Sequence, residues 1–193
     1  MVLAIVFFLL VFLDQITKAV AFALIGTDEP VFYWLGKMFG FDTLINKGMS
    51  FGIGADQPWA LPLFIALTSL AIVVMLFFVF RLRPKHRFLR TSLVLIMSGA
   101  AGNLIDRIVI GGVRDLIYMD FGFTCFSNNI ADILIFFGAI FFILALLFFD
   151  EDALFRLGKN RKKEKEQLEE AAHSLVESAK TEEEENDSSK KNG

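Results

Sequence analysis

The amino-acid sequence predicts an all-α integral membrane protein with four transmembrane helices. Of its 193 residues, 55% are hydrophobic, and 23 are phenylalanines that a soluble chain of this size could hardly bury. Four segments reach the roughly 20 apolar residues that a helix needs to cross a bilayer. They lie at 2–25, 59–81, 89–113 and 130–149. Inside hydrocarbon each backbone polar group needs an internal partner, so these segments are expected to be helices.

The first segment, 2–25, has a second interpretation as a cleaved signal peptide. Its end, "AVAFALIG", offers small residues that resemble a cleavage site. However, its start, "MVLAIVFF", carries no basic side chain, and Asp14 and Lys18 interrupt the apolar run. We therefore expect a retained helix.

Basic residues predict the orientation of the helices. The stretch between the second and third segments carries five of them, namely Arg81, Arg83, Lys85, Arg87 and Arg90. The much longer link 26–58 has only Lys37 and Lys47. By the positive-inside rule, both termini and the basic link are expected to be cytoplasmic. Residues 26–58 and 114–129 should then face outward.

Residues 150–193 differ in composition from the rest of the chain. They are poor in aromatic residues and end in the charged run "KTEEEENDSSKKNG". Runs of like charge are usually solvated and mobile. We expect a membrane domain at 1–149 and a largely disordered cytoplasmic tail at 150–193.

Ionisable side chains interrupt the first and third segments, and at membrane depth such residues indicate function by default. Asp14 and Lys18 are four residues apart and so share one helix face. Asn103, Asp106 and Arg107 lie in "SGAAGNLIDRIVIGG". The simpler interpretation is that each group forms its own ion pair, beside a packing face of small residues.

The depth of these residues favours a shared site instead. At ~1.5 Å rise per residue, Lys18 and Asp106 both lie roughly 25 Å from the cytoplasmic start of their helices. Asp115 is expected at the outer end of the third helix, and Asp132 at the outer start of the fourth. The sequence therefore predicts one polar site near the outer interface.

Several chemistries are compatible with such a site. A metal centre needs histidine or a third carboxylate, but His86 and His173 lie on the cytoplasmic side. Cys125 is the single cysteine, which leaves no metal site of the cysteine type. Serine catalysis would need a pairing such as Ser50 with Lys18, for which the spacing gives no reason. Two close carboxylates can hydrolyse a peptide bond without a metal ion or a serine nucleophile, because one carboxyl holds a proton while the other acts as a base on water.

Two other classes of protein remain open at this point. A proton- or ion-coupled transporter would use the charged residues as a relay, namely Asp14, Lys18, Asp106 and Asp115. Such a relay predicts polar groups through the whole membrane depth, yet the second segment offers only Thr68 and Ser69. A purely structural membrane subunit would leave the two aspartates unexplained.

Five motifs across residues 1–149 resemble, in order, those of the bacterial lipoprotein signal peptidases (signal peptidase II). The first three are "DQITK" with Asp14 and Lys18, "NKGMSFG" with Asn46, Gly48 and Phe51, and "SGAAGNLIDRI" with Gly102, Asn103, Asp106 and Arg107. The last two are "GGVRDLI" with Asp115 and "NNIADILI" with Asn129, Ala131 and Asp132.

The resemblance implies an aspartic endopeptidase with Asp115 and Asp132 as its catalytic dyad. Such enzymes remove the signal peptide of prolipoproteins by cutting before a cysteine that carries a diacylglyceryl group. The resemblance further implies a set of residues that bind substrate or support the site, namely Asp14, Lys18, Asn46, Gly48, Asn103, Asp106, Arg107 and Asn129.

The resemblance also implies a setting for the enzyme. The protein is expected to be a monomer that crosses the bacterial cytoplasmic membrane several times, with its active site at the outer face. Prolipoproteins and membrane lipid are its expected partners, nucleic acid is not, and neither a cofactor nor a metal is implied. The outward link 26–58 should form a small β element and a short helix that cover the substrate.

Four positions depart from the family pattern. Asn128 stands where phenylalanine is usual, and Phe126 lies two residues earlier. Leu116 replaces a phenylalanine, while Ser98 and Ser50 replace glycine and alanine. These changes concern local packing and the fit of the outward link rather than the two aspartates.

Overall fold

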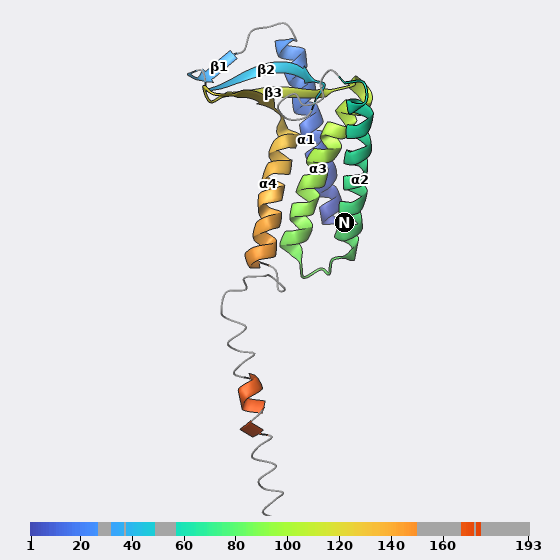
Figure 1. Ribbon diagram of the computed structural model, residues 1–193, viewed down its shortest axis with the longest axis vertical. Coiled ribbons are helices and arrows are strands. Elements are labelled where there is room, and N and C mark those ends of the chain that lie inside the picture. The colour runs from blue at the N-terminus through green and yellow to red at the C-terminus, as the bar shows by residue number, and fades with distance from the viewer. Residues whose placement is uncertain (27–31, 37, 49–56, 150–166, 172, 175–193) are drawn as a thin grey trace, which may run out of the picture. The chain divides into compact units, whose positions relative to one another are not determined.

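The protein divides into two units, Met1–Leu146 and Leu147–Gly193. The computed structural model (Figure 1) describes residues 1–26, 32–36, 38–48, 57–149, 167–171 and 173–174. In the second unit the described residues of 167–174 are helical. The division into a membrane domain and a tail at residue 149 stays a prediction.

Among the described residues, four helices have the length and apolar composition to cross a membrane, as predicted. They are α1 (Val2–Ile25), α2 (Ala60–Arg81), α3 (Arg87–Ile110) and α4 (Ile130–Leu144), which a π-helical turn, η2 (Ala145–Phe149), continues. The four predicted helices are therefore confirmed, with differences at their ends.

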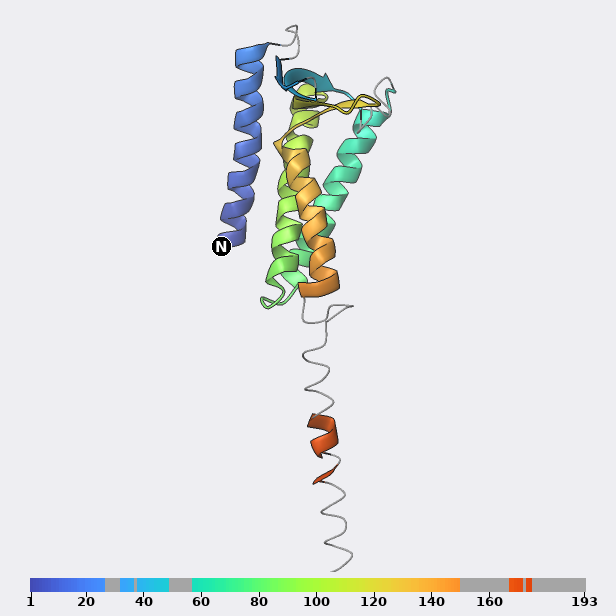
Figure 2. The ribbon, with the colours of Figure 1, turned by 90° about the vertical axis from the view of Figure 1, so that its left-hand side faces the viewer.

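Helix α3 is the centre of the bundle. Half of its most apolar stretch is buried, compared with 11% to 17% in the other three helices. It packs against α1, α2 and α4. Figure 1 shows it between α4 and α2, and Figure 2 shows it between α1 and α2. The helix that carries Asn103 and Asp106 is thus the one that lipid reaches least.

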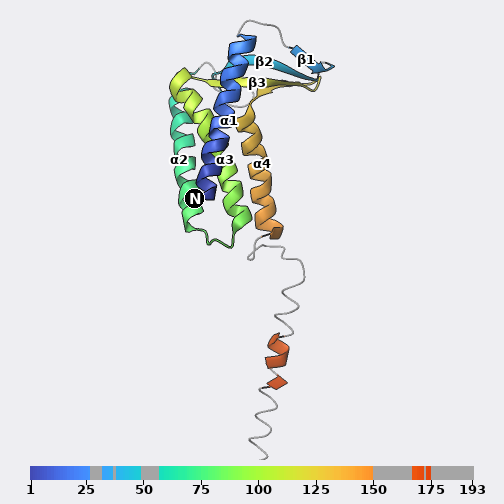
Figure 3. The same cartoon turned by 180° about the vertical axis from the view of Figure 1, so that it is seen from behind.

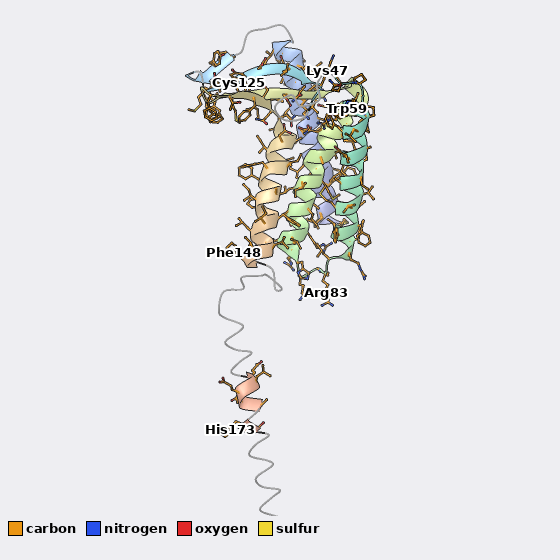
Figure 4. The ribbon with its side chains drawn as sticks, in the orientation of Figure 1. Lys47, Trp59, Arg83, Cys125, Phe148 and His173 are labelled. Atoms are coloured by element: carbon orange, nitrogen blue, oxygen red, sulfur yellow. The ribbon has the colours of Figure 1, made fainter. Side chains whose placement is uncertain are left out.

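A four-stranded antiparallel sheet lies across one end of the helices, which we call the sheet end (Figures 1 and 3). Its order is β1 (Phe32–Leu35), β2 (Phe39–Asn46), β3 (Val113–Asp120) and β4 (Cys125–Asn128). The N-terminus and the link between α2 and α3 lie at the opposite end of the bundle. Figure 4 labels Lys47 and Cys125 at the sheet end and Arg83 at the opposite end.

The sheet is larger than the small β element that was predicted beside the four helices. The β element expected in the link 26–58 is present as β1 and β2. However, β3 and β4 come from residues that were predicted to be a helix end and a link. The short helix predicted in the same link is not among its described residues, and residues 49–56 lie outside them.

The third helix ends earlier than predicted, at Ile110 rather than at residue 113. Gly111 adopts a left-handed conformation with φ of 79°, which glycine tolerates best, and its N–H donates to the Arg107 carbonyl at 3.2 Å. The chain then turns into β3 at Val113. As a result Asp115 lies on a strand and not at the end of a helix.

Small residues let α3 approach its neighbours closely, as the packing-face interpretation predicted. A Cβ atom at Gly99 would overlap the carbonyl oxygen of Ala131 in α4. A Cβ atom at Gly102 would overlap the carboxylate of Asp14 in α1. These contacts bring polar groups of three helices together at the sheet end.

A separate apolar core lies between the first half of α3 and the last turns of α2, towards the end of the bundle opposite the sheet. It consists of Val79, Leu93, Val94 and Met97. Side chains of α1 and α4, among them Phe7 and Phe142, pack against it.

Candidate active site

Lys18 is the centre of a buried charged cluster that joins α1 to α3. Its side chain is 0% exposed, and its Nζ lies 2.9 Å from Asp14 Oδ2 and 3.3 Å from Asp106 Oδ2. It also donates a hydrogen bond of 2.9 Å to Asn103 Oδ1. The prediction that Lys18 and Asp106 lie at one level is confirmed. The Asp14–Lys18 ion pair of the simpler interpretation is present, but it is not separate, because Lys18 also pairs with Asp106 of α3.

Asp14 extends this cluster to the start of α4. Its Oδ1 accepts a hydrogen bond of 2.9 Å from the backbone N–H of Ala131, one of the N–H groups in the first turn that no helix carbonyl satisfies. The space for this contact exists because residue 102 is a glycine. Asp14 therefore fixes the first turn of α4, in which Asp132 lies.

Gln15 and Arg114 complete the coordination of Asp106. The Arg114 guanidinium donates to Asp106 Oδ1, with Nη2 at 2.7 Å and Nε at 3.3 Å. Gln15 Nε2 also donates to Asp106 Oδ1 at 3.2 Å. In addition, Gln15 Oε1 accepts from Arg114 Nη2 at 2.9 Å. Asp106 thus pairs with one cation from α1 and another from β3.

Asn103 connects the charged cluster around Lys18 to Asp132. Its side-chain oxygen accepts from Lys18, so its amide nitrogen must point the other way, and it donates to Asp132 Oδ1 at 2.8 Å. An amide has one acceptor side and one donor side, so the lysine decides which side Asp132 meets.

Asn129 connects Asp132 to Asp115. It caps α4 in a capping box: its Oδ1 accepts from the Asp132 N–H at 3.0 Å, while Asp132 Oδ2 accepts from the Asn129 N–H at 3.2 Å. The side-chain amide nitrogen of Asn129, Nδ2, donates to Asp115 Oδ1 at 2.7 Å. One residue therefore contacts both aspartates.

Asn46 on β2 supplies the fourth donor. The backbone N–H of Gly48 donates to Asn46 Oδ1 at 3.0 Å, which leaves Asn46 Nδ2 to donate to Asp115 Oδ2 at 3.1 Å. Each of the four carboxylate oxygens of Asp115 and Asp132 thus accepts one hydrogen bond. Carboxylates held in this way keep a fixed orientation with respect to each other.

The environment of Asp115 favours its protonated form. Its side chain is only 2% exposed. Burial, and then the negative charge of Asp132, raise the pKa of Asp115 to about 7, against the hydrogen bonds from Asn46 and Asn129. Near neutral pH this carboxyl can therefore hold a proton and donate it.

A cavity of about 590 Å³ opens beside the two aspartates. Arg107 lines it, with its guanidinium carbon 5.7 Å from the ring centre of Phe64. The other lining residues come from β2, α3, β3, β4, α4 and the segments beside the strands, namely Leu44, Asn46, Gly48, Asn103, Val113, Asp115, Thr124, Cys125, Phe126, Ser127, Asn128 and Asp132. Within the described ranges, no group of three or more His, Cys, Asp or Glu side chains could hold a metal ion.

Comparison with known proteins identifies the family to which this site belongs. Residues 6–148 match the family model described as signal peptidase (SPase) II. The chain belongs to the signal peptidase II family. It is therefore a membrane peptidase of bacterial type.

Individual signal peptidase II relatives match this chain over most of their own length. The lipoprotein signal peptidase of Clostridium tetani is 36% identical over 141 residues, which span 71% of this chain and 86% of that protein. The lipoprotein signal peptidase of Aquifex aeolicus is 36% identical over 137 residues, 70% of this chain and 80% of that one. A solved bacterial membrane enzyme superposes with a TM-score of 0.65 at 26% identity, over 76% of this chain and 87% of the other.

Among the residues that the signal peptidase II resemblance selected as site residues, all but one make polar contacts within this network. The exception is Arg107, which lines the cavity beside Phe64. The neighbouring Asp106 forms its ion pairs with Lys18 and Arg114 instead. The roles of the selected residues stay predictions.

Two residues of the network were not predicted, Gln15 and Arg114. Both stand inside the motifs "DQITK" and "GGVRDLI", directly beside predicted site residues. A polar side chain next to a predicted site residue was the available signal. The wall of the cavity formed by residues 124–128 was missed because β4 was missed.

The departures from the family pattern are accommodated locally. Ser98 is buried, and its hydroxyl donates to the Val94 carbonyl at 2.7 Å. Leu116 is buried beside the site. Phe126 and Asn128 both line the cavity, so the exchange places an amide on a wall of the cavity. Ser50 lies outside the described residues.

Proposed function

We propose that the protein is an aspartic endopeptidase that removes the signal peptide of prolipoproteins, cutting before a cysteine that carries a diacylglyceryl group. Membership of the signal peptidase II family supports the substrate class. The observation that carries the catalytic type is the pair of carboxylates, Asp115 and Asp132. Each of their oxygens accepts a hydrogen bond, and both line one cavity.

The two aspartates have different surroundings, which supports different roles for them. Asp132 lies in the first turn of α4, where the positive end of the helix dipole favours a negative charge. Asp115 lies on a strand, and its pKa is raised to about 7. We assign the ionised base to Asp132 and the protonated acid to Asp115.

Peptide hydrolysis then needs no covalent intermediate. Asp132 takes a proton from a water molecule while Asp115 gives its proton to the carbonyl oxygen of the scissile bond, which yields a tetrahedral diol. Asp132 next passes its proton to the leaving nitrogen, and Asp115 recovers a proton from a hydroxyl of the diol as the C–N bond breaks. Both carboxyls end in their starting states.

The substrate explains why the site lies at one end of the helices. A prolipoprotein held by acyl chains and a signal helix stays in the membrane plane, so its scissile bond lies near an interface. Residues of the sheet and of the adjacent parts of α3 and α4 line the cavity, which supports a position of the scissile bond near an interface. Arg107, with its planar set of donors, is suited to hold backbone carbonyls of the substrate there.

The basic link that contains Arg83 lies at the end opposite the sheet, which supports a cytoplasmic position for that end. The active site then faces outward from the bacterial cytoplasmic membrane, in contact with membrane lipid. One chain supplies both aspartates, so a monomer suffices for catalysis. Residues 150–193 are proposed to form a cytoplasmic tail without a role in the chemistry.

A transporter relay receives less support. In the described part of the chain, the buried charged residues are Asp14, Lys18, Asp106 and Asp115, and all belong to the network at the sheet end. The buried polar residues of the opposite half of α3, such as Ser92, bond to their own helix. A relay would need charged groups along the remaining depth.

The test is cleavage of a diacylglyceryl-modified prolipoprotein by the purified protein. Asp115→Asn and Asp132→Asn should each lower the rate by about 10²–10⁴-fold, the usual contribution of a positioned acid or base. Asp120→Asn is the matched control, because Asp120 lies on the same strand, does not line the cavity, and accepts a hydrogen bond from the Gly122 N–H that asparagine can keep. Substantial turnover by either dyad variant, with Asp120→Asn unaffected, would refute the mechanism.

A further inference from the structure

Arg114 directly precedes Asp115 but does not line the cavity. Its side chain is 15% exposed and turns towards α1 and α3, where it meets Asp106 and Gln15. Substrate in the cavity would therefore meet Asp115 but not the guanidinium beside it. Any effect of Arg114 on catalysis has to pass through its neighbours.

The main chain of residue 114 is held on both sides. Its N–H donates to Asp106 Oδ2 at 3.0 Å, which ties β3 to α3. Its carbonyl accepts from Asn129 Nδ2 at 3.3 Å, which ties β3 to the start of α4. The side chain adds a third tie, to Gln15 in α1. The residue before Asp115 thus connects the strand to three helices.

The charge of Arg114 also completes a balance within the cluster. Asp14 and Asp106 carry two negative charges, and Lys18 and Arg114 carry two positive charges. Without Arg114, Lys18 would be the only cation paired with these two buried carboxylates. Asp106 would then attract Lys18 more strongly, at the expense of the bond between Lys18 and Asn103 that orients Asn103 towards Asp132.

Both paths lead from Arg114 to the proposed dyad. One runs through the strand to Asp115, and the other runs through Asp106, Lys18 and Asn103 to Asp132. A misplacement of reacting groups by about 1 Å can cost about 100-fold in rate, so small shifts at either end matter.

We propose that Arg114, supported by Gln15, is a positioning residue that sets the mutual orientation of Asp115 and Asp132 without touching the substrate. This inference rests on the proposed function. It predicts an effect on turnover rather than on substrate affinity, because the side chain lies outside the cavity.

The test compares kcat and KM for prolipoprotein cleavage by Arg114→Met, Arg114→Lys and Gln15→Met. For Arg114→Met, kcat should fall between about 10-fold and 100-fold, while KM stays within about 3-fold of the parent. Arg114→Lys keeps a positive charge beside Asp106, so its kcat should lie between that of Arg114→Met and that of the parent. The effects of Arg114→Met and Gln15→Met on kcat should be less than additive in the double variant, because both changes remove the bond between Arg114 and Gln15, whereas Gln15→Met also removes the donors to Asp106 and Gly102.

Two controls show whether a loss of kcat arises from the contacts of Arg114 with Asp106 and Gln15. Arg83→Met removes an arginine from the opposite end of the bundle and should leave both constants unchanged. Asp115→Asn tests the dyad in the same assay. If this variant cleaves prolipoprotein at the parental rate, the proposed function itself is refuted. If Asp115→Asn is inactive while Arg114→Met keeps the parental kcat, only the positioning role fails.

Two further outcomes decide the remaining cases. A raised KM with unchanged kcat would make Arg114 a substrate-binding residue and overturn the proposal. If Arg114→Met does not fold, the lysine and Gln15→Met variants decide: lowered kcat at parental KM in both supports positioning, and parental kcat in both refutes it.

Discussion

The two halves of α3 are both buried, but against different kinds of side chain. The half towards the basic link packs Leu93, Val94 and Met97 against apolar neighbours. The half towards the sheet buries Asn103 and Asp106 among charged groups from α1 and β3. A helix can be packed by either means, so the charged half must be explained by something besides stability.

The energetics of buried charge supply that explanation. Taking ions out of water is costly, and replacing a buried ion pair by apolar residues is often neutral or stabilising. The apolar half should therefore govern stability, and the charged half should govern catalysis through the geometry of two carboxylates. The following predictions test this separation, starting with the largest expected effect.

Asp115→Asn should separate activity from stability most clearly. Cleavage should fall by about 10²–10⁴-fold. The pKa of Asp115 is raised to about 7 in the folded protein, compared with about 3.9 in the unfolded chain. Between these two pH values the folded state therefore binds more protons than the unfolded state. The free energy of unfolding of the parent therefore decreases as pH rises through this window, and the asparagine variant lacks this loss.

The measurement is the melting temperature of both proteins in detergent, once in acidic and once in mildly alkaline buffer, at about pH 5 and about pH 8. The melting temperature of the variant minus that of the parent should be more positive in the alkaline buffer. Comparing the two buffers removes any constant cost of placing an amide beside Asn46 and Asn129. A difference that does not change with pH would mean that Asp115 is not held at a raised pKa.

Arg107→Lys should reduce activity while leaving stability nearly unchanged. Lysine keeps the charge but loses the planar group that lies 5.7 Å from the Phe64 ring and that can meet two acceptors at once. We expect kcat/KM to fall roughly tenfold, about 1.4 kcal/mol of transition-state stabilisation. A fully active lysine variant would show that charge alone suffices at this position.

Leu93→Ala should have the opposite profile. Leu93 is buried in the apolar core, and its truncation leaves a cavity that costs about 2–5 kcal/mol in well-packed proteins. The melting temperature should drop by several degrees, while kcat of the folded enzyme stays within about twofold of the parent. Leu70→Ala is the matched control, since Leu70 is 61% exposed on α2. If Leu93→Ala lowered kcat but not the melting temperature, the apolar half of α3 would govern catalysis rather than stability, against this account.

Removal of residues 166–193 should have the smallest effect. The truncated protein ends at Lys165 and so keeps the basic cluster that favours a cytoplasmic C-terminus. It should cleave prolipoprotein at close to the full-length rate. A markedly slower reaction at equal expression and membrane insertion would assign the tail a role in catalysis.

Hydropathy and spacing predicted much of this molecule. Runs of apolar residues located four helices, and helix rise placed Lys18 level with Asp106, far apart in sequence but 3.3 Å apart in the fold. These features are local or periodic, so a single sequence displays them. The capping box of Asn129 and Asp132 is a local pattern of the same kind, Asn-x-x-Asp.

Contacts between distant segments have no local signature. The pair of Arg114 and Gln15 joins residues 99 positions apart through a contact that only the assembled fold creates. Residues 113–128 were predicted to be a helix end and a link, because the strand β3 buries the adjacent residues Asp115 and Leu116 and so lacks a clean alternation. Only its pairing with β2 makes it a strand.

The central claim is that Asp115 works protonated beside an ionised Asp132, and the pH dependence of kcat/KM tests it most directly. This quantity reports the ionisation of the free enzyme. With the pKa of Asp115 at about 7, kcat/KM for prolipoprotein cleavage should decline above neutrality, approaching about tenfold per pH unit. A value of kcat/KM that stays constant or rises between about pH 7 and pH 9, with the enzyme folded throughout, would contradict this mechanism.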